Sequence, residues 1–340
     1  MQAQAASLDV VAKFGAKADL NTDLSKLSEI TTHFNTLTVK TCIISLLIYF
    51  VLPLLDAWKE ACGSTTPTAI LIPEGTYLLS QATLEGPCKA PIELQLEGNV
   101  KAPADPKAFK EPKWVSFLHI ENFKLFGGGA FDGQGTTSYK REGCEKHDFC
   151  SNLPIFDQCN GTRYITLRDS KQFHANVLGC KNITFEHVTV SAPKDSPNTD
   201  GIHIGRSDGV KIIDTNIKTG DDCISIGDGA KNLDITGIKV SKCTLTDTSN
   251  GVRIKTWAGE FPGTASDMHF EDITVKNVSC PVLIDQKYCP WNKCKMDAES
   301  NVKLSNISFK NIHGTAALPE VVKLVCSGIF PCEKFRTHRH

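Results

Sequence analysis

The stretch Asn182-Ile-Thr-Phe-Glu-His-Val-Thr-Val190 begins with a small polar residue and then alternates β-branched or aromatic residues with polar ones. The same pattern returns in Gly209-Val-Lys-Ile-Ile-Asp-Thr-Asn-Ile217, Asn232-Leu-Asp-Ile-Thr-Gly-Ile-Lys-Val240 and Val302-Lys-Leu-Ser-Asn-Ile-Ser-Phe309. Alternation with a period of two, broken by Asn, Asp and Gly, is typical of short strands joined by turns and not of helices. The region from about 160 to 312 is therefore predicted to be a series of short strands.

A second series of strand-like segments runs in parallel with the first. Its members are Asp200-Gly-Ile-His-Ile204, Asp222-Cys-Ile-Ser-Ile226 and Asn250-Gly-Val-Arg-Ile254, which start 22 and 28 residues apart. A period in the twenties, with strands inside each unit, indicates a leucine-rich repeat or a parallel β-helix. Leucine does not recur at fixed offsets, so we predict an all-β chain folded as a right-handed parallel β-helix.

In such a solenoid each coil stacks its Ile and Val side chains on those of the next coil. Equivalent polar residues then form a surface ladder with a spacing of about 4.8 Å. We therefore expect Asp200, Asp222 and Arg253 to be neighbours. The segment Leu54–Cys62 is predicted to be a short helix that caps the N-terminal coil against strand addition.

Composition limits the domain organisation and the partners. With 340 residues and 41% hydrophobic residues, the chain has the size and composition of one large domain or two ordinary ones. We predict a single β-helix domain over residues 1–340. Lys and Arg total 37 against 38 Asp and Glu, so no net field favours nucleic acid or a membrane surface. We expect a monomer without a nucleic-acid or membrane partner.

Fourteen cysteines without a Cys-x-x-Cys motif favour disulfides over structural zinc. Four N-glycosylation sequons, which begin at Asn160, Asn182, Asn277 and Asn306, are acceptor sites in a protein that passes through the secretory pathway. We therefore expect a secreted protein of the extracellular space or cell wall, although residues 1–11 lack the basic start and apolar core of a signal peptide. The apolar run Cys42–Leu55 has 14 residues, short of the roughly 20 that span a bilayer.

Three short motifs along the second series contain residues suited to catalysis or binding: Asn198-Thr-Asp200, Gly220-Asp-Asp-Cys223 and Arg253-Ile-Lys255. Each Asp alone is more often a turn cap, but the shared register favours a site. Clustered carboxylates supply the acid and the base of glycoside hydrolysis, and Arg and Lys suit an anionic sugar. This combination indicates a uronic-acid polymer as the substrate. A calcium-dependent lyase would also use clustered Asp residues, and spacing alone leaves that alternative open.

The motifs Asn198-Thr-Asp-Gly201, Gly220-Asp-Asp-Cys-Ile-Ser-Ile226 and Arg253-Ile-Lys255 closely resemble the first, second and fourth signatures of the polygalacturonases, glycoside hydrolase family 28. The resemblance also covers Phe131-Asp-Gly-Gln-Gly135 and Leu54-Leu-Asp-Ala-Trp-Lys-Glu-Ala-Cys62. It is strongest with the plant and especially pollen-type exopolygalacturonases. The motif order disfavours the lyase.

The resemblance implies hydrolysis of the α-1,4 linkages of galacturonan in pectin with inversion of configuration, without metal or cofactor. By the same resemblance Asp221 is the general acid, and Asp200 and Asp222 activate water. Arg253 and Lys255 hold the substrate carboxylate, and Tyr288 matches a subsite tyrosine. We assign Asn198 and His203 to substrate contact. Because His203 lies between two apolar strand positions, a structural role or a substrate contact is favoured over catalysis.

The chain departs from the family pattern in one place that affects the site. The third signature, which contains Gly-His-Gly, is absent, and no histidine occurs between His203 and His269. About one coil is missing, and a solenoid can re-stack after such a loss. We expect Arg253 and Lys255 to lie one rung closer to Asp222, where they favour ionised carboxylates and lower the pKa of the acid. This predicts reduced or absent hydrolysis, and a catalytically inactive pectin-binding β-helix is the alternative.

Three further departures concern the rest of the chain. Residues 27–53 interrupt a run that otherwise continues from Ser25-Lys26 into Leu54, and we interpret them as an insertion foreign to the family. Residues 333–340 form a divergent, truncated tail. In the family the cysteine equivalent to Cys223 pairs with one in the lost coil, so Cys223, Cys42 in the insertion, or both are predicted to be free thiols.

Overall fold

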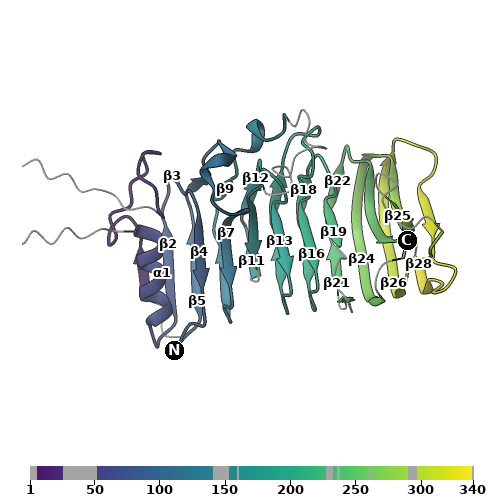
Figure 1. The fold of residues 1–340 in the computed structure, drawn as a ribbon, viewed down its shortest axis with the longest axis horizontal. Coiled ribbons are helices and arrows are strands. Elements are labelled where there is room, and N and C mark those ends of the chain that lie inside the picture. The colour runs from purple at the N-terminus through teal and green to yellow at the C-terminus, as the bar shows by residue number, and fades with distance from the viewer. Residues whose placement is uncertain are drawn as a thin grey trace, which may run out of the picture.

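The computed structural model describes residues 6–25, 52–140, 153–158, 161–226, 233–235, 238–259, 262–289 and 297–338. The chain winds into a stack of coils along one axis, with helix α1 (Pro53–Gly63) over the first coil and β28 (Glu333–His338) at the other end (Figure 1). All the strand pairings described are parallel, and they join one coil to the next. The right-handed parallel β-helix and its capping helix are confirmed.

Each coil has three faces. The first face contains β1 (Ala6–Asp9), β2 (Thr68–Ile72), β5 (Ile92–Leu96), β8 (Phe123–Phe126), β11 (Gly161–Arg163), β14 (Thr184–Glu186), β17 (Lys211–Ile213), β21 (Ile238–Ser241), β24 (Gly263–Val278), β26 (Val302–Ala316) and β28. The second contains β3 (Thr76–Leu78), β6 (Asn99–Lys101), β9 (Ala130–Asp132), β12 (Thr166–Arg168), β15 (Thr189–Ser191), β18 (Asn216–Lys218) and β22 (Thr244–Thr246), and continues into β24 and β26. A short strand, β20 (Leu233–Ile235), starts a further column against β24.

The third face carries the candidate site. Its strands are β4 (Ala82–Glu85), β7 (Lys113–Leu118), β10 (Ile155–Gln158), β13 (Ala175–Leu178), β16 (Ile202–Gly205) and β19 (Ile224–Ile226), followed by a separate sheet of β23 (Asn250–Trp257), β25 (Cys280–Tyr288) and β27 (Val322–Val325). The first two faces continue through this junction. Within the described part of the chain, no strand pairing joins β19 to β23. The hydrogen-bonded ladder is thus interrupted on the face that carries the site, at the point where the sequence analysis places the missing coil.

Two-residue alternation places the apolar residues inside the solenoid. One interior stack crosses five successive coils through aligned, buried side chains, namely Phe185, Ile212, Val240, Phe270 and Phe309. The rings of Phe270 and Phe309 are stacked with centroids 5.5 Å apart. The continuous core therefore spans the junction between β19 and β23.

The N-terminal end is closed by α1. Trp58 and Leu54 of this helix are buried, and the Trp58 indole donates a hydrogen bond to the Glu85 carbonyl at 3.1 Å. The Leu54 amide donates to the Leu24 carbonyl at 3.1 Å, so the two flanks of the inferred insertion meet. Residues 26–51 lie outside the described residues, and the insertion itself stays a prediction.

Disulfides and free thiols both occur. Cys62 is bonded to Cys88, and Cys326 to Cys332, as the cysteine content predicts. Cys223 is free and buried, which agrees with the expected loss of its partner. Cys42 lies outside the described residues. The tail segment Glu333–His338 forms β28 and pairs with β26, so this divergent sequence still adds a strand.

Candidate active site

The three aspartates lie at the turns that lead into β16 and β19. Asp200 precedes β16 and is 7% exposed; Asp221 is exposed, and the Asp222 side chain is 9% exposed. The Gly201 amide donates to the Asp222 carbonyl at 3.0 Å, which joins the two turns in register. The predicted ladder thus brings the three carboxyl groups together on adjacent coils.

Asp200 is the most strongly perturbed carboxyl group of the three. Burial raises its pKa to about 7, with a further rise from the charge of Asp221. A hydrogen bond from Ser225 and the charge of Lys255 act in the opposite direction but are weaker. Lys255 favours the ionised form of Asp200, as expected, but desolvation outweighs its effect at this residue.

Asp222 is bound directly by the two cations of β23. Its Oδ2 lies 2.6 Å from Lys255 Nζ, and its Oδ1 lies 3.7 Å from Arg253 Nη1. Burial lowers the pKa of Lys255, but the attraction of Asp222 outweighs it, so this pKa lies above its ordinary value. The predicted approach of the cations to Asp222 is confirmed, and it spans the break between β19 and β23.

Tyr288, at the end of β25, lies against both cations. The Arg253 guanidinium is 4.8 Å and Lys255 Nζ is 5.0 Å from the centre of its ring. Trp257 packs edge-on against the same ring at 6.0 Å. Contacts of a cation with an aromatic face are favourable and restrict the cation's position. The ring therefore orients Arg253 and Lys255 toward the carboxylates.

Asn198 contacts the site through its backbone. Its amide donates to Asp221 Oδ2 at 3.3 Å, and the Asp222 amide donates to Asp221 Oδ1 at 2.8 Å. Asn198 has a left-handed backbone with φ of 53°, a conformation that Asn tolerates better than most residues. The turn at Asn198 thus fixes the orientation of the Asp221 carboxyl group.

His203 projects from β16 beside the aspartates. Its Nδ1 lies 2.7 Å from Ser225 Oγ, and its ring stacks on Phe173 at 4.5 Å. Burial and the charge of Lys255 lower the pKa of His203 to about 4. The imidazole is therefore neutral near neutral pH, which suits a hydrogen-bonding role better than that of a proton donor.

Two neighbours of His203 and one residue beneath Asp200 were missed by the sequence reasoning. Ser225 is one coil from His203 in the ladder, and that register is the signal that predicts it. Phe173 has no such signal. His174 is fully buried, and its Nδ1 lies 3.2 Å from the Asp200 carbonyl while its Nε2 accepts from the Ser170 amide at 3.3 Å. This arrangement holds the backbone of Asp200 in place.

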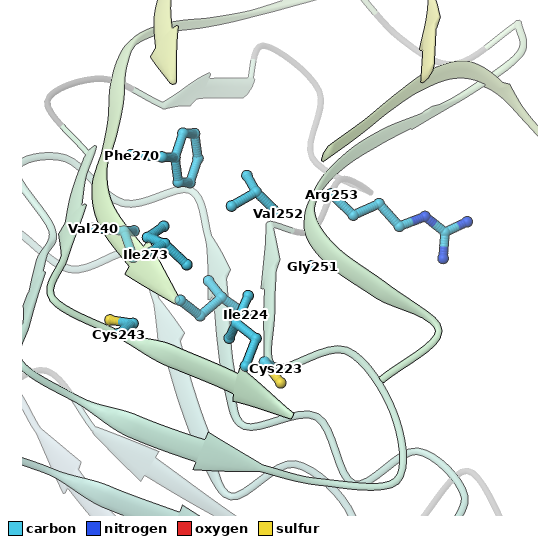
Figure 2. Close-up of a pocket in the computed structure, with 10 residues that line it drawn as sticks. Cys223, Ile224, Val240, Cys243, Gly251, Val252, Arg253, Phe270 and Ile273 are labelled. Atoms are coloured by element: carbon cyan, nitrogen blue, oxygen red, sulfur yellow. The ribbon is translucent and has the colours of Figure 1, made fainter. Parts of the chain in front are cut away.

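A small cavity lies inside the solenoid behind the cations. Cys223, Ile224, Val240, Cys243, Val252 and Phe270 line it, and Figure 2 shows Val252 pointing into it while Arg253 points away. Its volume open to a water-sized sphere is about 20 Å³, enough for about one water molecule. The coils flanking the junction are therefore closely re-stacked in the core.

A parallel β-helix that carries three clustered carboxyl groups and two cations on one face has the residue types that hydrolysis of an acidic sugar polymer requires. The sequence profile described as Glycosyl hydrolases family 28 matches residues 62–240 and 232–339. The chain belongs to this family.

Curated relatives agree with the profile. A polygalacturonase of Gossypium hirsutum is 54% identical over 360 aligned residues, which cover 97% of this chain and 82% of the relative. An exopolygalacturonase of Oenothera organensis is 51% identical over 310 residues, covering 82% of this chain and 86% of the relative. Most of the length of these relatives is therefore represented here.

Solved structures support the fold. The endo-xylogalacturonan hydrolase of Aspergillus tubingensis superimposes with a TM-score of 0.67 at 22% identity, over 84% of this chain and 87% of that one. The family 28 exopolygalacturonase of Yersinia enterocolitica gives a TM-score of 0.68 at 14% identity, over 99% of this chain and 66% of that one. At these identities the likeness concerns the β-helix alone.

Proposed function

We propose that the protein is a polygalacturonase that hydrolyses α-1,4-galacturonosyl linkages of pectin with inversion of configuration. The observation that carries the proposal is the single cluster in which Asp200, Asp221 and Asp222 adjoin Lys255 and Arg253. Membership of glycoside hydrolase family 28 and the polygalacturonase relatives support it.

The geometry divides the work among the carboxyl groups. Asp221 is exposed and oriented by two backbone amides, so it can reach the oxygen of the scissile linkage and donate a proton. Burial raises the pKa of Asp200 to about 7, whereas Asp222 is paired with Lys255 and Arg253. We therefore assign Asp222 as the carboxylate that takes a proton from the attacking water, with Asp200 beside it.

The remaining residues bind the substrate. Lys255 and Arg253 pair with the carboxylate of the bound galacturonate, while Tyr288 holds both cations in place. His203 and the Asn198 turn line the same face and contact sugar hydroxyl groups. A substrate carboxylate must compete with Asp222 for Lys255 Nζ, which lies 2.6 Å away. This competition, with the lost histidine, predicts a low turnover.

We propose that the protein is secreted into the cell wall. Two disulfides support it, because such bonds persist in oxidising environments. None of the described helices combines the length and apolar character needed to cross a bilayer.

Reducing-sugar release from de-esterified polygalacturonic acid tests the activity, with Asp221→Asn as the control and a chelator present. We expect release that requires Asp221 and persists with the chelator. A product that absorbs in the ultraviolet and requires calcium would instead indicate a lyase. A folded chain that binds the polymer without releasing sugar would overturn the hydrolase proposal and indicate a binding module.

A further inference from the structure

A second pocket lies on the same face as the aspartates, toward the N-terminal end of the solenoid. It opens over β7, β10 and β13, and its volume is about 390 Å³, within the range of small-ligand pockets. Leu118, Ile155 and Leu178 form much of its wall, and Lys113, Asp157 and Asn176 supply its polar groups. The mechanism proposed above uses none of these residues.

A continuous ladder connects this pocket to the catalytic cluster. Asp157, Asn176, His203 and Ser225 occupy equivalent positions on four successive coils. With rungs about 4.8 Å apart, Asn176 is one rung and Asp157 two rungs from His203. Phe173, stacked on His203, follows the pocket residue Gln172 in sequence. The pocket and the catalytic cluster therefore lie along the same ladder of strands, within reach of one oligosaccharide.

The charge of the pocket differs from that of the catalytic cluster. Asp157 is its carboxyl group and Lys113 its cation among the residues that line it, so they cancel. Asn176 donates to Asp157 Oδ1 at 2.8 Å, and Ser116 donates to Oδ2 at 3.4 Å. Burial raises the pKa of Asp157, because a charge is costly in this apolar wall. A substrate carboxylate in this pocket would lose hydration against the apolar wall, and Lys113, the cation among the lining residues, is already balanced by Asp157.

We propose that the pocket between β7 and β13 binds a methyl-esterified galacturonate unit, while a free galacturonate carboxylate occupies the Lys255 and Arg253 site. The ester methyl group packs against Leu178 and Ile155, and esterification removes the charge that would lose hydration there. This inference rests on the proposed function, and it adds that the enzyme accepts partly esterified pectin on the N-terminal side of the groove.

Oligomer binding by the full chain carrying Asp221→Asn tests the proposal without turnover. Isothermal titration would compare a de-esterified hexagalacturonate with a partly methyl-esterified one. We expect the partly esterified hexamer to bind at least as tightly. Leu178→Lys, which adds a cation to the wall, is expected to tighten binding of the de-esterified hexamer by about three- to five-fold, the range of an exposed ion pair.

A matched control separates this effect from a general gain of positive charge. Leu20, in the segment between β1 and α1 and outside the strands of the face that carries the site, is 43% exposed, close to the 47% of Leu178. Leu20→Lys is expected to leave both affinities unchanged, and Leu178→Ala to weaken binding of the esterified hexamer alone. Equal changes in both Lys variants, or a tenfold preference of the parent for the de-esterified hexamer, would overturn the inference only. Failure of the folded chain to bind either hexamer would overturn the proposed function as well.

Discussion

The buried carboxyl group of Asp200 makes the stability of the folded protein depend on pH. It is 7% exposed and its pKa is raised to about 7 from 3.8, first by burial and then by Asp221. The folded protein therefore binds the Asp200 proton more tightly than the unfolded chain does. Between about pH 4 and pH 7 stability falls as pH rises, because ionised Asp200 is disfavoured only in the folded state.

Asp200→Asn removes this titration. The variant is expected to match the wild type in stability near pH 4 and to exceed it at pH 8, by an amount on the order of 4 kcal/mol. Urea unfolding at pH 4, 5.5 and 8 measures the difference. Asp195→Asn, an exposed site on the preceding turn, is the control and is expected to change little. A difference between the Asp200 variant and the wild type that does not vary with pH would contradict the assignment.

Lys255 combines a substrate contact with an ion pair. Lys255→Gln removes both the charge and the partner of Asp222 Oδ2. A lost charged hydrogen bond costs roughly 1.5–3 kcal/mol, so kcat/KM on polygalacturonic acid is expected to fall by about ten- to a hundred-fold. Lys255→Arg keeps the positive charge and is therefore expected to retain part of the kcat/KM that Lys255→Gln loses. Steady-state kinetics measures kcat/KM for each variant, and Lys218→Gln, at an exposed position, is the control. Equal losses of kcat/KM in the Lys255→Arg and Lys255→Gln variants would mean that the charge is irrelevant.

Within the elements, corner residues divide the repeating stretches into short strands. Asn182–Val190 and Gly209–Ile217 each fold as two three-residue strands, which agrees with the predicted short strands joined by turns. His187 and Asp214 turn the chain between them with φ of 53° and 47°. An Asp such as Asp214 is among the residues that signal such a corner, whereas the alternation does not reveal the corner at His187.

Asn311 occupies an equivalent corner in β26 with φ of 51°, and its Nδ2 donates to Asp272 Oδ1 at 2.9 Å. Asn311→Val is expected to lower the free energy of unfolding by about 2 kcal/mol, because a β-branched side chain is strained in that conformation. Asn311→Gly, the matched variant, is expected to cost less. Urea denaturation compares the two, and equal losses would show that the side-chain bond alone matters.

Two free cysteines lie near the interrupted ladder between β19 and β23, and their burial determines how readily their thiols react. Cys223 and Cys243 are free and buried there, and burial raises the pKa of the Cys223 thiol to about 12 and that of Cys243 to about 11. Both are therefore expected to resist alkylation in the folded protein and to react after denaturation without reductant. Peptide mapping by mass spectrometry measures this, with partly buried Cys280 as the internal comparison. A disulfide-linked Cys223 peptide would contradict the account.

Sequence reasoning predicted the site in part. The recurring register placed Asp200, Asp222 and Arg253 on adjacent coils, and the cations do reach Asp222. The clustering of carboxyl groups predicts that one of their pKa values is raised, but not that Asp200 carries the rise, because its main cause is burial in the folded chain. The stacking of Phe173 on His203 escaped for a similar reason, since Phe173 lies in a turn outside the strand pattern.

At the scale of the whole molecule, the β-helix continues through the junction where a coil is predicted to be missing, because each coil contacts only its neighbours. Two faces and the Phe185-to-Phe309 interior stack pass through the junction. The interruption is confined to the third face, where Lys255 and Asp222 bridge it by an ion pair. The fold therefore remains continuous across the junction, and the interruption of strand pairing lies beside the candidate site.

The anomer of the first product tests the central claim most directly. Proton NMR during hydrolysis of a short de-esterified oligogalacturonide would follow the new reducing end before mutarotation. Inverting hydrolysis of an α-linkage through Asp221 and Asp222 predicts that the β-anomer appears first, and that Asp221→Asn forms none. Initial formation of the α-anomer, or no cleavage by the folded wild-type chain, would contradict the account.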